Sequence, residues 1–112
     1  MLGKPVFLFN PRFISGPNGG AIVELGTLGG TSSFANAIND SGQVTGLTYD
    51  STSNQRVFLT GSNGAGMTDL GSLGGPHSMG FGVNDAGQVV GRSYLANYAG
   101  THAFLTGPEP AV

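Results

Sequence analysis

The segment DLGSLGGPHSMGFGVNDAGQVVG, residues 69–91, decides the fold of this chain because a second segment repeats it. The second segment is ELGTLGGTSSFANAINDSGQVTG, residues 24–46, and a shift of 45 positions aligns the two without a gap. Of the 23 aligned positions, 12 are identical, and most others keep size and character, as Ile38 and Val83 do. The chain is therefore an internal repeat, the signature of solenoids, propellers and arrays.

The composition is typical of a small domain built from short strands. Of the 112 residues, 38% are apolar, 9% are charged and 21 are glycine. A disordered chain combines high charge with few apolar residues, so strands punctuated by glycine fit better. The formal net charge is −2, and the four cationic residues are scattered: Lys4, Arg12, Arg56 and Arg92. Nucleic acid is disfavoured as a partner, because phosphate binding needs clustered Lys and Arg.

The chain contains no cysteine, which excludes disulfides, thiolate metal sites and cysteine nucleophiles. Residues 1–13 (MLGKPVFLFNPRF) hold a short apolar run interrupted by Pro5 and Pro11. This run is too short for the apolar region of a signal peptide or for a membrane span. We therefore expect no membrane insertion, and either an intracellular protein or an excised piece of a secreted one.

Strand and turn signals alternate before the first repeat. Residues 6–9 (VFLF) predict a strand, and residues 10–20, with two prolines and an Asn-Gly pair, predict a loop or a wide hairpin. Residues 21–25 predict a second short strand. The glycines of residues 26–30 (GTLGG) then predict a bent connection, in which we expect Leu25 and Leu28 to be buried.

Each repeat also predicts a hairpin. Residues 34–39 alternate between a face of mostly large apolar residues and a face of small ones, and residues 79–84 repeat the scheme. The small residues indicate close packing, either against a neighbouring backbone or at a crowded central axis. Residues 43–46 and 88–91 predict the second arm of each hairpin. The turn residues between the arms are Asn39, Asp40, Gly42, Asn84, Asp85 and Gly87.

A third echo defines the repeating unit. Residues 57–61 (VFLTG) recur as residues 103–107 (AFLTG) and, more loosely, at residues 6–9. The unit then holds four short strands in about 46 residues, the pattern of a β-propeller blade. The predicted division is a first blade repeat with a long N-terminal hairpin loop (1–56), a second blade repeat (57–102) and the first strand of a third repeat (103–112).

The predicted fold is all-β, with two four-stranded antiparallel blade-like repeats plus a spare terminal strand. Two blades cannot close a ring, and a strand donated to the next chain is a means of joining identical copies. We expect a homo-oligomer that completes a β-propeller, a trimer of about six blades first and a tetramer of about eight next. The sequence does not decide whether the oligomer is a ring or a filament. It also does not decide which terminal strand pairs within its own chain.

The sequence resembles the HAF extracellular repeat family. The resemblance rests on residues 102–105 (HAFL), residues 69–75 (DLGSLGG) with their echo at 25–30, and residues 84–91 (NDAGQVVG). Such repeats usually form longer arrays in secreted or surface bacterial proteins, so the resemblance implies a propeller-like fold and an extracellular or cell-surface location. It carries no catalytic residues. Family strands often read HAFLW, whereas this chain has no Trp.

The residue pattern argues against a metal or a phosphate site. Asp40 and Asp85 each provide one carboxylate per turn, whereas a calcium loop needs several oxygen ligands at close spacing. The glycine pairs at 29–30 and 74–75 precede neither a helix nor a Lys-Ser/Thr pair. We expect no metal and no cofactor.

Catalysis is not indicated either. His77 and His102 are the only histidines, and no nucleophile-elbow pattern accompanies them. Glu24 and Asp69 occupy the same position in the two copies of the repeat. They are therefore not indicated as a pair of catalytic acids. We expect a protein that is not an enzyme.

The variable loops and strand ends are better candidates for binding. They carry aromatic faces and planar polar groups, which can stack on and hydrogen-bond a sugar. These candidate ligand-binding residues are Tyr49, His77, Arg92, Tyr94, Asn97 and Tyr98. The competing interpretation is that they are ordinary exposed or interface side chains.

Two classes of function therefore stay open. The first is a non-enzymatic extracellular module, an oligomeric propeller that binds a glycan or surface polymer through repeated weak sites. The second is a self-assembling scaffold, a ring or filament joined by strand donation without a small-molecule ligand. The sequence does not identify a ligand, nor does it distinguish a short protein from a fragment of a longer array.

Overall fold

The computed structural model describes residues 13–15 and 22–107. All the strand pairs in these ranges are antiparallel, and the only helical segments there are two 3₁₀ turns, η2 (Ser62–Gly64) and η3 (Ala96–Tyr98). Neither turn is long and apolar enough to cross a bilayer. The prediction of an all-β fold is confirmed.

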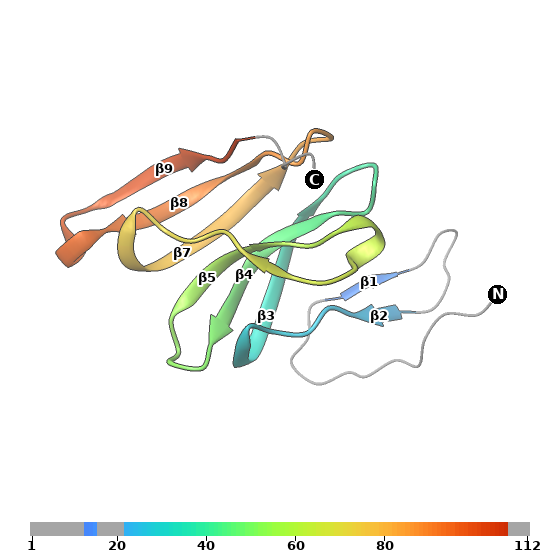
Figure 1. Cartoon of the computed structure of the whole chain (residues 1–112), viewed down its shortest axis with the longest axis horizontal. Helices are drawn as coiled ribbons and strands as arrows, with labels where there is room; N and C mark the ends of the chain where they lie inside the picture. The colour runs from blue at the N-terminus through green and yellow to red at the C-terminus, as the bar shows by residue number, and fades with distance from the viewer. Residues whose placement is uncertain (1–12, 16–21, 108–112) are drawn as a thin grey trace.

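The strands form a short ribbon and two larger sheets (Figure 1). The ribbon pairs β1 (Phe13–Ser15) with β2 (Ile22–Glu24). The first sheet has the order β3 (Gly29–Ile38), β4 (Val44–Asp50), β5 (Gln55–Leu59) and β6 (Thr68–Asp69). The second sheet has the order β7 (Gly74–Val83), β8 (Val89–Leu95) and β9 (Thr101–Leu105). Both sheets are meanders, since each strand pairs with the next one along the chain.

The boundary between the two sheets differs from the boundary between the repeat units that the sequence predicted. The division before residue 57 falls inside β5, and β5 and β6 pair with the strands that precede them. The second sheet has three strands among the described residues, whereas four were predicted. A tandem repeat reveals its period but not the point at which one sheet ends and the next begins.

The ribbon corrects one sequence assignment. Phe13 pairs with Glu24 in the ribbon, and Phe58 pairs with Asp69 in the first sheet, so both partners are shifted by the same 45 positions. The early counterpart of β5 is therefore β1, inside the segment 10–20 that was predicted as a loop or a wide hairpin. The predicted strand at residues 6–9 lies outside the described residues.

A β-bulge interrupts the regular pairing of β3 with β4 within residues 34–39. The register of β3 against β4 shifts between Ala35 and Ala37, and β7 against β8 shifts in the same way between Gly80 and Gly82. A side chain at Gly46, opposite the first bulge, would collide with the Phe34 carbonyl oxygen. A bulge adds one residue to a strand and bends it. Exposure still alternates along residues 34–39, with Phe34, Asn36 and Ile38 the more exposed residues, as the sequence predicted.

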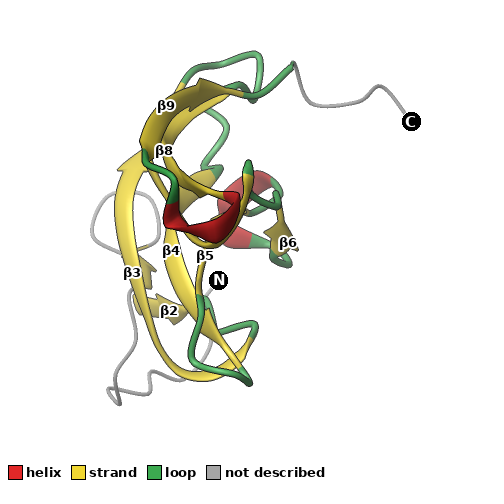
Figure 2. Ribbon diagram, turned by 90° about the vertical axis from the view of Figure 1, so that its left-hand side faces the viewer, coloured by secondary structure: helices red, strands yellow, loops and turns green. Residues whose placement is uncertain are grey.

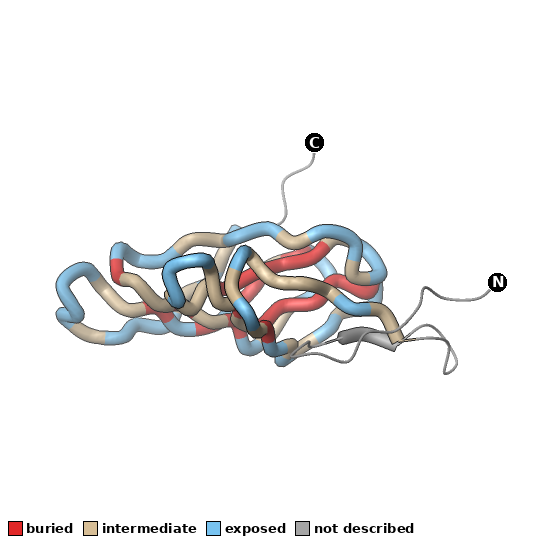
Figure 3. The backbone as a smooth tube through the Cα atoms, turned by 90° about the horizontal axis from the view of Figure 1, so that it is seen from below, coloured by how far each residue is buried: buried red, intermediate tan, exposed pale blue. Residues whose placement is uncertain are grey.

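The second sheet packs with β7 across the face of β4 and β5, and the two sheets follow each other in a curved stack (Figure 2). The core of this contact contains Val57, Leu59 and Val89, with relative exposures of 7% or less. Figure 3 shows the buried stretches gathered in the interior of the molecule. A methyl group at Gly80 would meet the Thr45 hydroxyl and lie 3.0 Å from Val57 Cγ2. The close packing predicted at the small residues is confirmed at Gly80.

Hydrogen bonds also join the two sheets. The Asn36 side-chain amide donates to the Gly80 carbonyl oxygen at 2.8 Å. The backbone N–H of Val57 donates to Ser78 Oγ at 3.0 Å. No buried side-chain nitrogen or oxygen within the described ranges lacks a partner, so the polar core costs little desolvation energy. Leu25 and Leu28 are half-buried, which is less than the sequence predicted.

Candidate functional site

The two NDxG turns lie at one end of the sheets and share one hydrogen-bond pattern. Asn39 Oδ1 accepts the backbone N–H groups of Ser41 and Gln43, each at 3.0 Å. Asn84 Oδ1 accepts the equivalent groups in the second turn. Gly42 and Gly87 have φ values of 80° and 79°, which favour glycine. Local chemistry therefore shapes both turns in the same way.

The turns also contact each other across the two sheets. The Asn39 side-chain amide donates to the Asn84 carbonyl oxygen at 2.8 Å, and the Asp40 N–H donates to Asp85 Oδ1 at 3.0 Å. A side-chain hydrogen bond and the negative charge of Asp85 raise the pKa of Asp40 above its ordinary value. No group of three or more His, Asp and Glu side chains gathers in the part of the chain that the structure describes. These two hydrogen bonds therefore connect the two sheets at this end.

The opposite end holds a cluster of aromatic rings that we call the tip cluster: His77, Tyr94 and Tyr98. His77 and Tyr94 meet edge to face with ring centroids 5.6 Å apart, and Tyr94 and Tyr98 repeat this geometry at 5.6 Å. Gln55 links the cluster to the first sheet, because its N–H donates to His77 Nδ1 at 3.0 Å and its side-chain amide donates to the Tyr49 hydroxyl at 3.2 Å. The structure thus brings Tyr49, His77, Tyr94 and Tyr98 together from four separate segments.

Asn97 and Tyr98 belong to the 3₁₀ turn η3, which follows β8 at this end. Both have left-handed backbone conformations, with φ of 58° and 55°, and Tyr98 is 63% exposed. A positive φ is an outlier for a bulky residue, and such strain persists where the surroundings hold it. The hydrogen bond from Leu95 N–H to the Gly100 carbonyl oxygen, 2.8 Å, closes the loop that presents the Tyr98 ring to solvent.

The equivalent loop of the first sheet has a different surface. Asp50 Oδ1 accepts the N–H groups of Thr52 and Asn54 and the Thr52 hydroxyl. These bonds, the Thr52 hydroxyl first, lower the pKa of Asp50. The first loop is therefore a compact polar turn, and only the second loop presents an aromatic ring.

Arg92 has a different environment from the tip cluster. Its guanidinium carbon lies 5.8 Å from the centre of the Phe81 ring. Both residues are exposed and belong to the second sheet. Arg92 therefore belongs to the surface of that sheet that carries Phe81.

That surface is the feature that sequence reasoning missed, and we call it the open face: Phe81, Val90, Ala103 and Leu105. Val90 pairs with Leu105 in the second sheet just as Thr45 pairs with Leu59 in the first. Thr45 and Leu59 are 0% and 7% exposed beneath β7, whereas Val90 and Leu105 are 48% and 63% exposed. The sequence feature that could have indicated this surface is Val90, an apolar residue at the position of Thr45. The sequence does not show that Val90 is exposed, because its exposure depends on the packing of the sheets.

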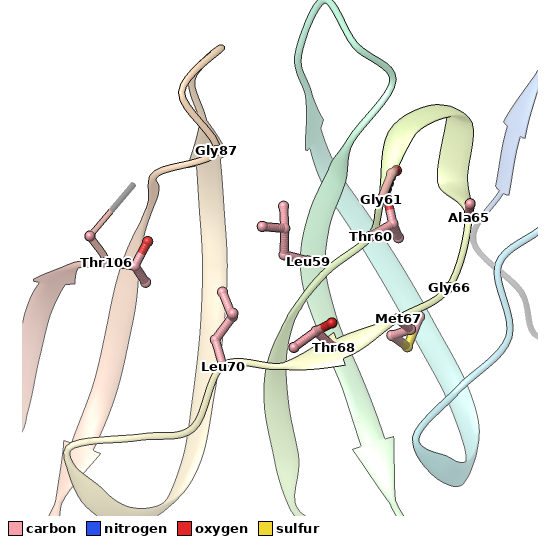
Figure 4. A pocket seen from close by; sticks show the side chains of 11 residues that line it. Leu59, Thr60, Gly61, Ala65, Gly66, Met67, Thr68, Leu70, Gly87 and Thr106 are labelled. Carbon is pink, nitrogen blue, oxygen red and sulfur yellow. Dashed lines mark hydrogen bonds between the residues drawn. The ribbon is translucent and has the colours of Figure 1, made fainter. Parts of the chain in front are cut away.

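Two grooves follow the boundary between the sheets. The larger, of about 580 Å³, lies between Leu59 and Leu70 on one side and Gly87 and Thr106 on the other (Figure 4). Its lining contains no ionisable side chain, so it offers apolar contact rather than acid–base chemistry. The smaller, of about 150 Å³, includes Phe104 and Leu105.

Comparisons with family models, with curated proteins and with solved structures gave no match.

Proposed function

We propose that this chain is a non-enzymatic, self-assembling repeat module that stacks the open face of its second sheet on another copy of itself. The observation that carries the proposal is the contrast between equivalent positions. Thr45 is fully buried by the next sheet, and its counterpart Val90 is 48% exposed. Because the chain already packs one such sheet face on another sheet, a second copy is the partner with matching geometry.

The residues of the open face strengthen this interpretation. Val90 replaces Thr45, and Phe81 replaces Asn36, whose amide bonds to the adjoining sheet. The open face is more apolar than the covered face at these two positions, whereas Arg92 stands where the first sheet has Leu47. Burying a large apolar side chain contributes about 1.5 to 3 kcal/mol, so Phe81, Val90 and Leu105 together favour association.

Repeated stacking of sheets with a constant curvature is the geometry of a propeller ring. The curved stack of the two sheets (Figure 2) supports a β-propeller completed by several chains, with the trimer proposed first and the tetramer next. The resemblance to HAF extracellular repeats supports an extracellular or cell-surface setting. In this proposal the assembly itself is the function, with a ring or a filament as its product.

The test is the solution mass of the chain, measured by light scattering on a sizing column over a range of concentrations. We expect a discrete oligomer for the wild type and a monomer for Val90→Glu, because a carboxylate cannot be buried unpaired at the interface. Ser51→Glu, which adds the same charge at an exposed loop residue, is the matched control and should assemble. A monomeric wild type, or a Val90→Glu variant that assembles normally, would refute the proposal.

A second candidate function, glycan binding, is favoured by the tip cluster. The Tyr98 ring is 63% exposed and is held against Tyr94, and exposed aromatic faces of this kind can stack on sugar rings. Tyr98→Ala should weaken binding in a glycan array at least tenfold while the solution mass stays unchanged. Binding by Tyr98→Ala is compared with binding by Tyr49→Ala, which removes a more buried ring at the same end. No binding by the wild type, or equal binding by Tyr98→Ala, would refute this function.

A further inference from the structure

We infer that the outer edge of β9 is completed by strand β2 of a second copy, which becomes the fourth strand of the second sheet. The inference rests on the self-assembly proposed above and specifies its chemistry as strand exchange between chains. The first sheet is the internal template for the second, because the two sheets derive from the same repeat.

The first sheet shows how its fourth strand attaches. β6 pairs with β5 through Phe58 opposite Asp69 and Leu59 opposite Thr68. The N–H of Leu70 extends the ladder by donating to the Val57 carbonyl oxygen at 3.0 Å. Asp69 Oδ2 also accepts from Arg56 Nε at 3.2 Å, in an exposed ion pair. These contacts define a register and a charge pair that the second sheet can be compared with.

The second sheet ends at β9, whose pairing with β8 repeats that of β5 with β4. Phe104 lies opposite Gly91 as Phe58 lies opposite Gly46. β9 is the last strand of its sheet among the described residues. Phe58 is fully buried, whereas Phe104 is only partly buried. An open strand edge beside a partly exposed phenylalanine is a template for strand addition.

The described residues include another strand of the type that pairs with β5, namely β2. β2 is the counterpart of β6, since Glu24 pairs with Phe13 as Asp69 pairs with Phe58. In the same register, Glu24 of a second copy would lie opposite Phe104 of the first. The Glu24 carboxylate would then lie beside His102, which stands at the position of Arg56. A histidine can donate a hydrogen bond to a carboxylate, so the Glu24–His102 pair takes the place of Asp69–Arg56.

Exchange is favoured because the pairing that β2 gives up is short. Its ladder with β1 is a two-stranded sheet with three residue pairs, and an isolated two-stranded ribbon is marginally stable in water. Transfer to β9 places the same strand in a four-stranded sheet, which matches the first sheet. Exchange of an identical element between copies is a low-cost route to assembly.

The test combines charge reversal with hydrogen exchange on the full chain. His102→Glu places two carboxylates side by side, and we expect association to weaken roughly two- to fivefold, the size of an exposed charge pair. The double variant Glu24→Lys/His102→Glu restores an opposite-charge pair and should recover wild-type association. The amides of Ala103 and Leu105 should exchange more slowly in the assembled wild type than in monomeric Val90→Glu.

The outcomes separate this inference from the proposed function. A monomeric wild type would overturn both. An oligomer in which the Ala103 and Leu105 amides exchange as fast as in the monomer would overturn strand exchange alone and leave assembly through the open face. Failure of the double variant to recover association, with His102→Glu impaired, would also overturn the Glu24–His102 register.

Discussion

Asp40 and Asp85 hold the same position in the two copies of the repeat, and the structure places them in contact: the Asp40 N–H donates to Asp85 Oδ1 at 3.0 Å. The repeat thus produces a neighbouring pair of carboxylates simply by packing one copy on the next. The backbone hydrogen bond stabilises the contact, while the two negative charges oppose it.

The pH dependence of stability should report this pair. Asp85 raises the pKa of Asp40 above 3.8, so the folded chain binds more protons than the unfolded chain between 3.8 and the raised value. Stability from this group therefore increases as the pH falls through that window. Asp85→Asn keeps an oxygen acceptor and removes the charge, so we expect a higher urea midpoint at neutral pH and a weaker gain on acidification. Identical pH profiles for the two proteins would contradict this account.

Gly80→Ala should destabilise the packing of the two sheets. The added methyl group would meet the Thr45 hydroxyl and Val57 Cγ2, and overpacking a core costs about 1 to 3 kcal/mol. Gly107→Ala is the matched control, because no atom of the described residues, apart from the neighbours of Gly107 in the chain, lies within 4 Å of a Cβ there. A change within about 0.5 kcal/mol is expected. Urea unfolding measures both. Equal midpoints for the two variants would show that the sheets do not approach closely at Gly80.

Ser78→Ala tests the polar part of the same contact. Ser78 Oγ accepts the Val57 N–H at 3.0 Å and donates to the Gly71 carbonyl oxygen at 2.8 Å, and the residue is 2% exposed. Loss of both bonds should reduce the free energy of unfolding by about 1 to 3 kcal/mol. Ser72→Ala removes a hydroxyl from an exposed residue that donates to Gly75, and its cost should be smaller. A reversed order would argue against Ser78 as a link between the sheets.

The backbone of the loop beside the tip cluster is tested by two substitutions at Asn97. Its φ of 58° is unfavourable for alanine and easy for glycine. We expect Asn97→Ala to lose about 1 kcal/mol of stability relative to Asn97→Gly, measured by thermal or urea unfolding. Equal stability of the two variants would mean that residue 97 does not hold a left-handed conformation in solution.

Strand and turn chemistry is local, which explains how much of the fold was predictable. Asn39 bonds to groups two and four residues away, and Gly42 supplies the positive φ that the turn requires. The 45-residue repeat likewise predicted a hairpin in each copy, and the structure shows that these hairpins pair in equivalent registers. The sequence did not predict which early segment corresponds to β5, because residues 6–9 (VFLF) and 13–15 (FIS) both resemble it. The pairing of Phe13 with Glu24 identifies residues 13–15 as the counterpart.

The candidate site was predictable by residue type and not by arrangement. Tyr49, His77, Tyr94 and Tyr98 were identified as aromatic or planar residues near strand ends, but they come from four segments. Their contact depends on how the loops of the two sheets lie together. Arg92 shows the same limit, since it has the expected residue type but contacts Phe81 on the open face.

The sequence by itself determined the strands, the tight turns and the repeat, because those features depend on residues a few positions apart and on one recurring pattern. Only the tertiary structure decided which face of each sheet is covered. Thr45 and Val90 hold equivalent positions in equivalent strands, yet one is fully buried and the other is 48% exposed. The physical reason is that burial depends on what packs against a surface, and the described chain places a sheet over Thr45 but leaves Val90 exposed.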